Sequence, residues 1–441
     1  MKNEEILPIL LDWNFWEKKQ ETGIKRNSYV NLLYPFLKTN QAIAIAGVRR
    51  SGKSTIMMQL AKKLIDSGVE PRDILIVNFE DYRFYDLSLE LLHNIYEIYL
   101  TKVAINKKRV VFLDEIHKIA GWEKFVRTLL DRKEAKMIVS GSNTKLISDE
   151  YARLLTGRHV EIRIFPLNFK EFLLFKGLKL ESELKILAKR VEIRRYLEEY
   201  LQYGGFPEVV LSSEKTRKKI LLDYVESIIT KDVAERHKVK EKAKLRSLAR
   251  YYLSNISNKV SFNKLKDYLN IPLRTIERFS YYLEEAYLVF FLKRFSFKVK
   301  EQEKANRKIY SIDVGISNAF GFGFSKDIGK VIENAVFLEL AKKNVNNPLF
   351  EIYYWQDPQG KEVDFVLKDG TRIKQLIQVC HNISDLDTKK RELKALSKAS
   401  KELGCKNLLV ITANYEGEEK LKSKNKTYKV KFMPLWKWLL A

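Results

Sequence analysis

The chain has 441 residues, 45% of them hydrophobic, and this length exceeds that of one compact domain. Lys and Arg number 81 against 56 Asp and Glu, a formal net charge of +25 that favours a polyanionic partner such as nucleic acid. Two cysteines, Cys380 and Cys405, exclude a disulfide framework and indicate the reducing cytoplasm. The sequence has no run of about 18 apolar residues and no signal-peptide pattern, so we expect no membrane association.

Short apolar runs alternate with helix-like segments over the first third of the chain. The runs are 41–46, 74–79, 109–114 and 136–140, and the helix-like segments include Thr55–Ile65 and Leu87–Leu100. Strands that alternate with helices predict a parallel sheet with both faces covered. We expect this first domain to span residues 1–166.

A phosphate-binding loop follows the first apolar run. The residues from Gly47 to Ser54 fit G-x-x-x-x-G-K-[ST] at every fixed position, between an expected strand and an expected helix. In this motif the lysine reaches the β- and γ-phosphates, and the serine hydroxyl binds Mg²⁺. We therefore predict that ATP and Mg²⁺ are the cofactors and that the nucleotide is bound by Gly47, Val48, Arg49, Arg50, Ser51, Gly52, Lys53, Ser54 and Thr55.

Two carboxylates, Asp114 and Glu115, stand at the end of the apolar run 109–114. Ligands of open α/β sheets bind at the carboxyl ends of the strands. Asp114 is the predicted Mg²⁺ ligand beside Ser54, and Glu115 is the predicted group that polarises the attacking water. The alternative is a strand that merely ends in two acids.

The middle of the chain is helical and basic. We predict a helical lid over 167–242 and a winged helix over 243–320, whose second helix begins at Pro272. Exposed positions on that helix are expected at Arg274, Thr275, Arg278 and Tyr281. A basic strand over 293–300 is expected as the wing. Residues 214–310 hold 24 Lys and Arg against 12 Asp and Glu, a net charge of +12. This predicts DNA contact, and the alternative is a winged helix that touches no DNA.

Residues 321–441 return to an α/β pattern. A helix is expected over Lys330–Asn344 and another over Asp387–Leu403. Strand-like runs are 351–355, 362–367, 373–380 and 407–412.

An ordered series of motifs runs through nearly the whole chain: GVRRSGKST, NFED, FLDEIH, SGSN, LLTGR, FPLNFKEF, GGFPE, KIYSIDVGI and GKEVDFVL. The series resembles the AAA-type, STAND-like P-loop ATPases (AAA_14) that carry a C-terminal DUF4143 region. The resemblance implies an AAA+/ASCE-like parallel sheet. It also implies that Asn143, with Ser142 as second choice, orients the attacking water. Arg158 then matches the position of an arginine finger, and the alternative for it is a capping or surface arginine.

The C-terminal region resembles the restriction-endonuclease-like fold. Glu333 and Asp364 match two of its acidic positions, whereas Gln378 replaces a metal-binding carboxylate and Cys380 replaces a lysine. An amide is a poorer Mg²⁺ ligand than a carboxylate. We therefore expect a degenerate nuclease-like domain with weak or no nuclease activity.

Together these features predict an Mg²⁺-dependent ATPase whose nucleotide state switches the contacts of its winged-helix and nuclease-like domains with DNA. An ATP-gated, metal-dependent nuclease is one alternative. A nucleotide-controlled protein-interaction switch without a DNA role is another. A protein partner or a homo-oligomer fits either reading.

Overall fold

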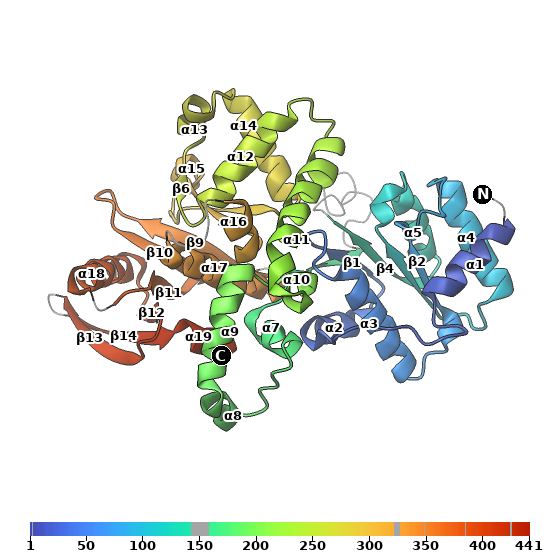
Figure 1. The fold of residues 1–441 in the computed structure, drawn as a ribbon, viewed down its shortest axis with the longest axis horizontal. Coiled ribbons are helices and arrows are strands. Elements are labelled where there is room, and N and C mark those ends of the chain that lie inside the picture. Colours follow the sequence, from blue (N-terminus) through green and yellow to red (C-terminus); the bar gives the residue numbers. More distant parts are fainter. Residues whose placement is uncertain (2, 143–157, 322–326, 348, 384, 424–425) are drawn as a thin grey trace. The chain divides into compact units, whose positions relative to one another are not determined.

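The computed structural model describes residues 1, 3–142, 158–321, 327–347, 349–383, 385–423 and 426–441 (Figure 1). The chain divides into two compact units, Met1–Phe165 and Pro166–Ala441. Each unit is described by itself below.

Unit 1 is built on a five-stranded sheet in the order β2-β3-β4-β1-β5, with every neighbouring pair parallel. Most of its residues are buried, as expected when both faces of a parallel sheet are covered. The predicted strands and their parallel arrangement are therefore confirmed. The strands are β1 (Ala42–Ala46), β2 (Ile74–Asn78), β3 (Arg109–Asp114), β4 (Ala135–Gly141) and β5 (His159–Arg163).

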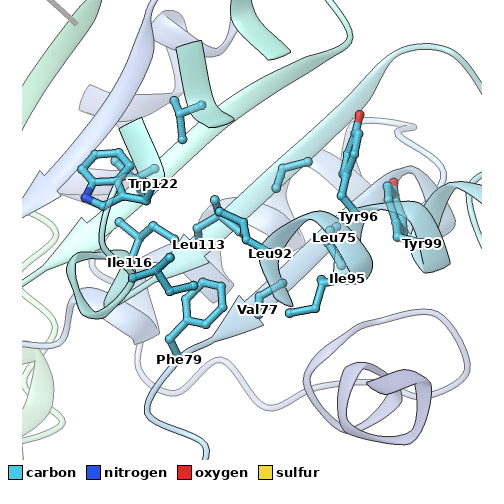
Figure 2. Packing of buried hydrophobic residues seen from close by; sticks show 14 of the residues in the cluster. Leu75, Val77, Phe79, Leu92, Ile95, Tyr96, Tyr99, Leu113, Ile116 and Trp122 are labelled. Carbon is cyan, nitrogen blue, oxygen red and sulfur yellow. The ribbon is translucent and has the colours of Figure 1, made fainter. Parts of the chain in front are cut away.

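Helices cover this sheet. They are α1 (Asn3–Trp13), α2 (Asn27–Leu33), η1 (Tyr34–Lys38), α3 (Lys53–Asp66), η2 (Pro71–Asp73), α4 (Leu89–Lys102), η3 (Ile116–Lys118) and α5 (Trp122–Asp131). One large core cluster joins alternate strand residues to α1, α4 and α5. Figure 2 shows part of it, with Val77 and Leu113 of the sheet near Leu92 and Ile95 of α4. This core fixes the carboxyl ends of β1 and β3, where the predicted site lies.

The edge strand β2 is protected by residues that follow α1. The side chain of Asn14 accepts a hydrogen bond from Ile76 N and donates one to Ile76 O, at 2.7 and 2.9 Å. The Trp16 indole donates to Ile74 O at 2.8 Å. These contacts satisfy backbone groups that an open sheet edge would otherwise expose to pairing with another chain.

Unit 2 begins with helices: α7 (Phe169–Phe175), α8 (Glu183–Ala188), α9 (Arg190–Tyr203), α10 (Pro207–Leu211), α11 (Glu214–Ser227) and a π-helical segment, η5 (Ile228–Glu235). The first of these starts with a capping box, in which Asn168 and Glu171 each accept a hydrogen bond from the backbone N–H of the other. The helical content predicted for 168–240 is confirmed.

Five helices and a small antiparallel sheet follow. The elements are α12 (Lys242–Ser254), β6 (Lys259–Val260), α13 (Phe262–Leu269), α14 (Leu273–Glu285), β7 (Val289–Leu292), α15 (Val299–Lys304), β8 (Arg307–Ser311) and α16 (Val314–Phe320). The sheet order is β6-β8-β7. Pro272 is the N-cap of α14, so the predicted start of that helix is confirmed.

The basic strand expected over 293–300 is wrong. Strand β7 ends at Leu292, and α15 begins at Val299. The intervening backbone is held by strand β9 (Phe350–Gln356), because Tyr354 N donates to Lys293 O and Phe295 N donates to Tyr354 O. Phe295 packs on this strand, with its ring centroid 5.5 Å from that of Tyr353, whereas Phe297 is exposed. Pattern alone could not separate this packing from an exposed wing.

The GGFP turn after α9 packs against Asp313, the N-cap residue of α16. Asp313 accepts a hydrogen bond from Gly205 N at 2.7 Å and one from Ile316 N at 3.2 Å. A Cβ on Gly205 would lie 2.3 Å from Leu167 O, so only glycine fits there. Burial raises the pKa of Asp313 to about 6. The GGFP turn and the KIYSIDVGI motif are therefore hydrogen bonded to each other within unit 2.

The end of unit 2 is a six-stranded mixed sheet in the order β13-β14-β12-β11-β10-β9. Its elements after β9 are β10 (Glu362–Asp369), β11 (Arg372–Cys380), α18 (Leu386–Leu403), β12 (Leu408–Thr412), β13 (Gly417–Ser423), β14 (Lys426–Pro434) and α19 (Leu435–Leu440), and α17 (Ile328–Asn346) precedes β9. Apolar residues of α18 pack on one face of the sheet. The α/β pattern is confirmed, and β13 and β14 are additions to the predicted strands.

Candidate nucleotide site

The phosphate-binding loop links the carboxyl end of β1 to the start of α3. Gly47 has φ +148°, and a Cβ there would lie 2.2 Å from Ile164 O. Gly52 has φ +95° and caps α3. Gly47 is needed both for space and for its backbone conformation, and Gly52 is needed for its backbone conformation. The buried hydroxyl of Ser51 has no hydrogen-bond partner among the described residues. A loop with this shape and an unsatisfied hydroxyl fits a phosphate-bearing ligand.

Lys53, the first residue of α3, is buried and points back into the loop. Its Nζ donates to Gly47 O at 3.1 Å and to Val48 O at 3.3 Å. The same Nζ lies 3.6 Å from Glu115 Oε1. The ammonium is thus placed between the loop and the carboxylates at the end of β3, where an incoming phosphate would find it.

Asp114 ends β3 and is buried beside two hydroxyls. Ser140, at the end of β4, donates to Asp114 Oδ1. The hydroxyl of Ser54 also hydrogen bonds to this carboxylate. Burial raises the pKa of Asp114, and the neighbouring Glu115 raises it further. The two predicted Mg²⁺ ligands therefore lie in contact, and they supply the hard oxygen donors that Mg²⁺ prefers.

Glu115 has left-handed backbone, with φ +53°. This conformation lets its N–H donate to Ser140 Oγ at 3.1 Å. Its Oε2 lies 3.2 Å from His117 Nδ1, so Lys53 and His117 flank the carboxylate. Strained backbone of this kind is commonly found at functional positions. His117 and Ser140 lie within the motifs FLDEIH and SGSN, but the motifs alone gave no role for them, and only the fold brings Ser140 to Glu115.

Other residues of the predicted loop lie at its outer side. Arg49 forms an ion pair of 3.0 Å with Glu80, which follows β2, and this interaction lowers the pKa of Glu80 against the effect of burial. Arg50, Ser54 and Thr55 are exposed. They are therefore open to a ligand from solvent.

The two residues assigned from the family resemblance have different outcomes. Asn143 lies outside the described residues, whereas its second choice, Ser142, is buried directly after β4. Arg158 precedes β5 and forms an ion pair with Asp131 of α5. Its carbonyl accepts from Ala42 N, at the amino end of β1. That is the opposite end of the strand from Gly47, so any contact of Arg158 with a nucleotide would be with that of another copy.

Arg26 is a further residue that the sequence did not indicate. Its buried guanidinium donates to Ser51 O at 2.8 Å and to Phe165 O at 3.0 Å. Its N–H donates to Gln59 Oε1 on α3 at 2.9 Å. Arg26 therefore ties the phosphate-binding loop to the helix behind it and to the end of unit 1. The residues around it, 23–26, carry no local signal for this contact.

In unit 2, the residues matched to a nuclease-like site do lie close together. Asp364 N donates to Gln378 Oε1 at 3.3 Å, and Val379 N donates to Asp364 Oδ2 at 2.9 Å. Gln378 Nε2 donates to Glu392 on α18 at 2.8 Å, so its amide is committed to protein contacts. Burial raises the pKa of the Cys380 thiol to about 11. Among the described residues, no group of three or more His, Cys, Asp or Glu could hold a metal ion.

Comparison with known proteins agrees with the motif series. Family models match residues 39–173 (AAA domain), 194–327 (Domain of unknown function, DUF8612) and 328–438 (Domain of unknown function, DUF4143). An uncharacterized protein of Methanocaldococcus jannaschii is 35% identical over 442 residues, which cover 98% of this chain and 94% of the relative. The chain belongs to the AAA-type P-loop ATPases with a C-terminal DUF4143 region.

Further relatives of this AAA-type chain are more distant. An uncharacterized protein of Haemophilus influenzae is 31% identical, and the match covers 82% of this chain and 88% of the relative. The Walker-type ATPase PABY2304 of Pyrococcus abyssi has a TM-score of 0.46 at 13% identity, over 67% of this chain and 95% of that one. The Aeropyrum pernix ORC1 protein, solved in complex with DNA, has a TM-score of 0.31 at 11% identity. The match covers 72% of this chain and 96% of that one.

In the described part of this AAA-type chain, no helix is both long enough and apolar enough to cross a membrane.

Proposed function

We propose that the chain is an Mg²⁺-dependent ATPase whose nucleotide state changes the contacts of unit 2 with DNA. The observation that carries the ATPase part is the meeting of Lys53, Ser54, Asp114 and Glu115 at the carboxyl edge of one parallel sheet. This edge brings together a cation, two candidate metal ligands and a candidate base. They lie beside a loop that needs glycine at positions 47 and 52.

Each of these residues has a distinct role in the proposal. The N–H groups of the loop and Lys53 would hold the phosphates, and Ser54 with Asp114 would hold Mg²⁺, which neutralises charge on the phosphate oxygens. Glu115 would accept a proton from the attacking water. Ser140 would help to position both residues, because it donates to the Asp114 carboxylate and accepts from the backbone N–H of Glu115.

Two variants test the ATPase assignment. Lys53→Ala removes the charge from the phosphate site, so ATP binding and turnover both fall. Glu115→Gln keeps the shape but cannot accept the proton, so ATP still binds while turnover falls by roughly 10²-fold or more. Glu97→Gln, an exposed glutamate on α4, serves as the control. ATP binding by equilibrium titration and phosphate release measure the two effects. Wild-type turnover in Glu115→Gln would remove Glu115 from the mechanism.

The DNA part of the proposal is supported by the middle of unit 2. The order helix, strand, helix, helix, strand, strand over α12–β8, interrupted only by the short α15, with sheet order β6-β8-β7, supports the proposal of a winged helix. Arg274 and Arg278 are exposed one turn apart on α14, and neither forms an ion pair within the described part of the chain. In contrast to these arginines, two basic residues of the expected wing do form ion pairs, Lys293 with Glu303 and Lys298 with Glu301. The phosphate contacts are therefore assigned to α14.

A protein-interaction switch without a DNA role is the second candidate. Leu184 and Leu187 of α8 and Val191 of α9 are 78%, 57% and 76% exposed. Apolar side chains that gather at the surface favour a protein partner. Absence of DNA binding at low salt, in both the ATP and the ADP state, would select this second candidate. The ATP-gated nuclease is disfavoured by the protein contacts of Gln378.

A further inference from the structure

A buried lysine from β8 reaches three carboxylates of the nuclease-like region. Lys308 Nζ lies 2.6 Å from Glu362 Oε1, 2.8 Å from Glu333 Oε1 and 2.8 Å from Asp364 Oδ1. Lys308 is only 2% exposed. A buried ammonium needs this degree of pairing, because an unpaired charge in the interior is very costly.

The carboxylates come from two elements. Glu333 lies on α17, and Glu362 and Asp364 lie on β10. Two neighbours complete the cluster: the Tyr310 hydroxyl donates to Glu333 Oε1 at 2.7 Å, and Lys259 donates to Glu362 Oε2 at 2.7 Å. Burial, with Asp364 nearby, raises the pKa of Glu333 to about 7. Three carboxylates thus surround one buried cation, the ammonium of Lys308.

Glu333 and Asp364 are the two acids that match metal-binding positions of the nuclease-like pattern. The Nζ of Lys308 therefore stands where oxygen ligands from these two positions converge. Oxygen ligands of Ca²⁺ lie at about 2.3–2.6 Å and those of Mg²⁺ at about 2.0–2.1 Å. The contacts of the ammonium, 2.6–2.8 Å, are close to the Ca²⁺ distances and clearly longer than those of Mg²⁺. A cavity of about 530 Å³ adjoins the cluster and is lined in part by Glu333, Glu362, Asp364 and Gln378. An ion from solvent has a route to the site.

We infer that the Lys308 ammonium is the resident cation of this centre and takes the place of a divalent metal. The centre is then a metal-independent clasp that joins β8 to α17 and β10. As they stand around the ammonium, the described carboxylates do not form a metal site. Removal of the lysine leaves three of them around one vacated point, where they can close on a divalent cation. The inference is independent of the proposed ATPase and DNA functions, since it rests on the contacts of Lys308, which neither function uses.

The test compares wild type with Lys308→Met in nucleotide-free full-length protein titrated with Mn²⁺. Methionine keeps the apolar stem of the side chain but lacks the terminal ammonium and its charge. We expect one additional equivalent of Mn²⁺ bound by Lys308→Met, counted by electron paramagnetic resonance of the free ion. At about a hundredfold excess over its Kd, Mn²⁺ also raises the Tm of this variant. Lys304→Met, which changes an exposed lysine of α15, behaves as wild type.

A second variant distinguishes a filled metal site from a merely structural lysine. Lys308→Met combined with Asp364→Asn carries less uncompensated charge, so it is more stable than Lys308→Met alone and loses the additional Mn²⁺. If Lys308→Met does not fold, this double variant still decides the matter, because the inference requires that it recover stability.

Three results would overturn the inference. The first is a folded Lys308→Met variant that binds no additional Mn²⁺. The second is wild-type Mn²⁺ binding that Asp364→Asn abolishes, which would mean that metal displaces the lysine. The third is a double variant no more stable than Lys308→Met.

Discussion

Arg26 shows how a single buried side chain can support the nucleotide site without being part of its motif. Its guanidinium donates to the carbonyls of Ser51 and Phe165, and its backbone is held by Gln59 of α3. Both carbonyls would be left without this donor if the guanidinium were removed. Because one of them belongs to the phosphate-binding loop, the loss acts on the shape of the loop itself.

Arg26→Ala should therefore weaken ATP binding more than it slows the chemical step. Loss of the buried charged hydrogen bonds costs about 1–3 kcal/mol of unfolding free energy. The KM for ATP should rise roughly tenfold, which corresponds to a loss of about 1.4 kcal/mol, while kcat changes less. Steady-state ATPase kinetics and denaturant unfolding measure the two effects. Arg72→Ala, which breaks only an exposed ion pair with Glu17, is the control. Unchanged KM in Arg26→Ala would show that the arginine does not position the loop.

The residues of the site divide by how far apart they lie in the sequence. Lys53, Ser54 and Asp114 could be predicted, because each belongs to a short motif with a fixed spacing. Ser140 and Arg26 could not, because the interactions that make them important cross 25 or more residues. Arg158 was placed from the resemblance, and only the pairing of β5 with β1 shows it at the amino edge of the sheet.

At the scale of elements, α14 is the helix whose surface is best suited to a phosphate backbone. Ile276, Phe279 and Leu283 are buried on one side, and Arg274, Arg278 and Tyr281 are exposed on the other. The apolar side is committed to the core of unit 2, so the basic side is available to a partner.

Replacement of both arginines by alanine should weaken DNA binding to a similar extent on unrelated sequences. Fewer counterions are released when the protein neutralises fewer phosphates, so the slope of log affinity against log salt should shrink by about one unit for each arginine that binds a phosphate. Arg190→Ala with Arg194→Ala on α9 is a matched control, since these exposed arginines have the same spacing. Fluorescence anisotropy over a salt series gives both slopes. An equal decrease in affinity in the control pair would mean that net charge, not α14, determines binding.

Elements with long apolar runs could be predicted from the sequence more readily than elements rich in charge. The strands of unit 1 are almost wholly buried, so their apolar runs stand out. Strand β13 lies at the edge of the second large sheet and is rich in charged residues, which leaves little apolar pattern. Strand β14, beside it, does alternate, because Tyr428, Val430 and Phe432 are buried between exposed lysines. The segment 293–300 has the opposite problem, because its alternation reflects packing beside β9 and not a strand.

At the scale of the whole molecule, the basic middle segment and the nucleotide site lie in different units. The phosphate-binding loop is in unit 1, whereas residues 214–310 of unit 2 carry +12 of the net charge of +25. A switch that couples the two requires a difference in affinity between nucleotide states, and coupling free energies of this kind typically correspond to about 5–150-fold. The division into lid, winged helix and nuclease-like domain stays a prediction within unit 2.

The most direct test of the account is the affinity for one duplex DNA, measured at constant low salt in the ATP and ADP states. Glu115→Gln holds the ATP state, since it binds ATP without efficient turnover, and Lys53→Ala provides a protein blind to nucleotide. We predict that the Kd for DNA differs at least about fivefold between ATP-bound and ADP-bound Glu115→Gln. The same addition of nucleotide should leave the Kd of Lys53→Ala unchanged. Equal DNA affinity in both states of Glu115→Gln, with ATP shown to be bound, would contradict the proposed switch.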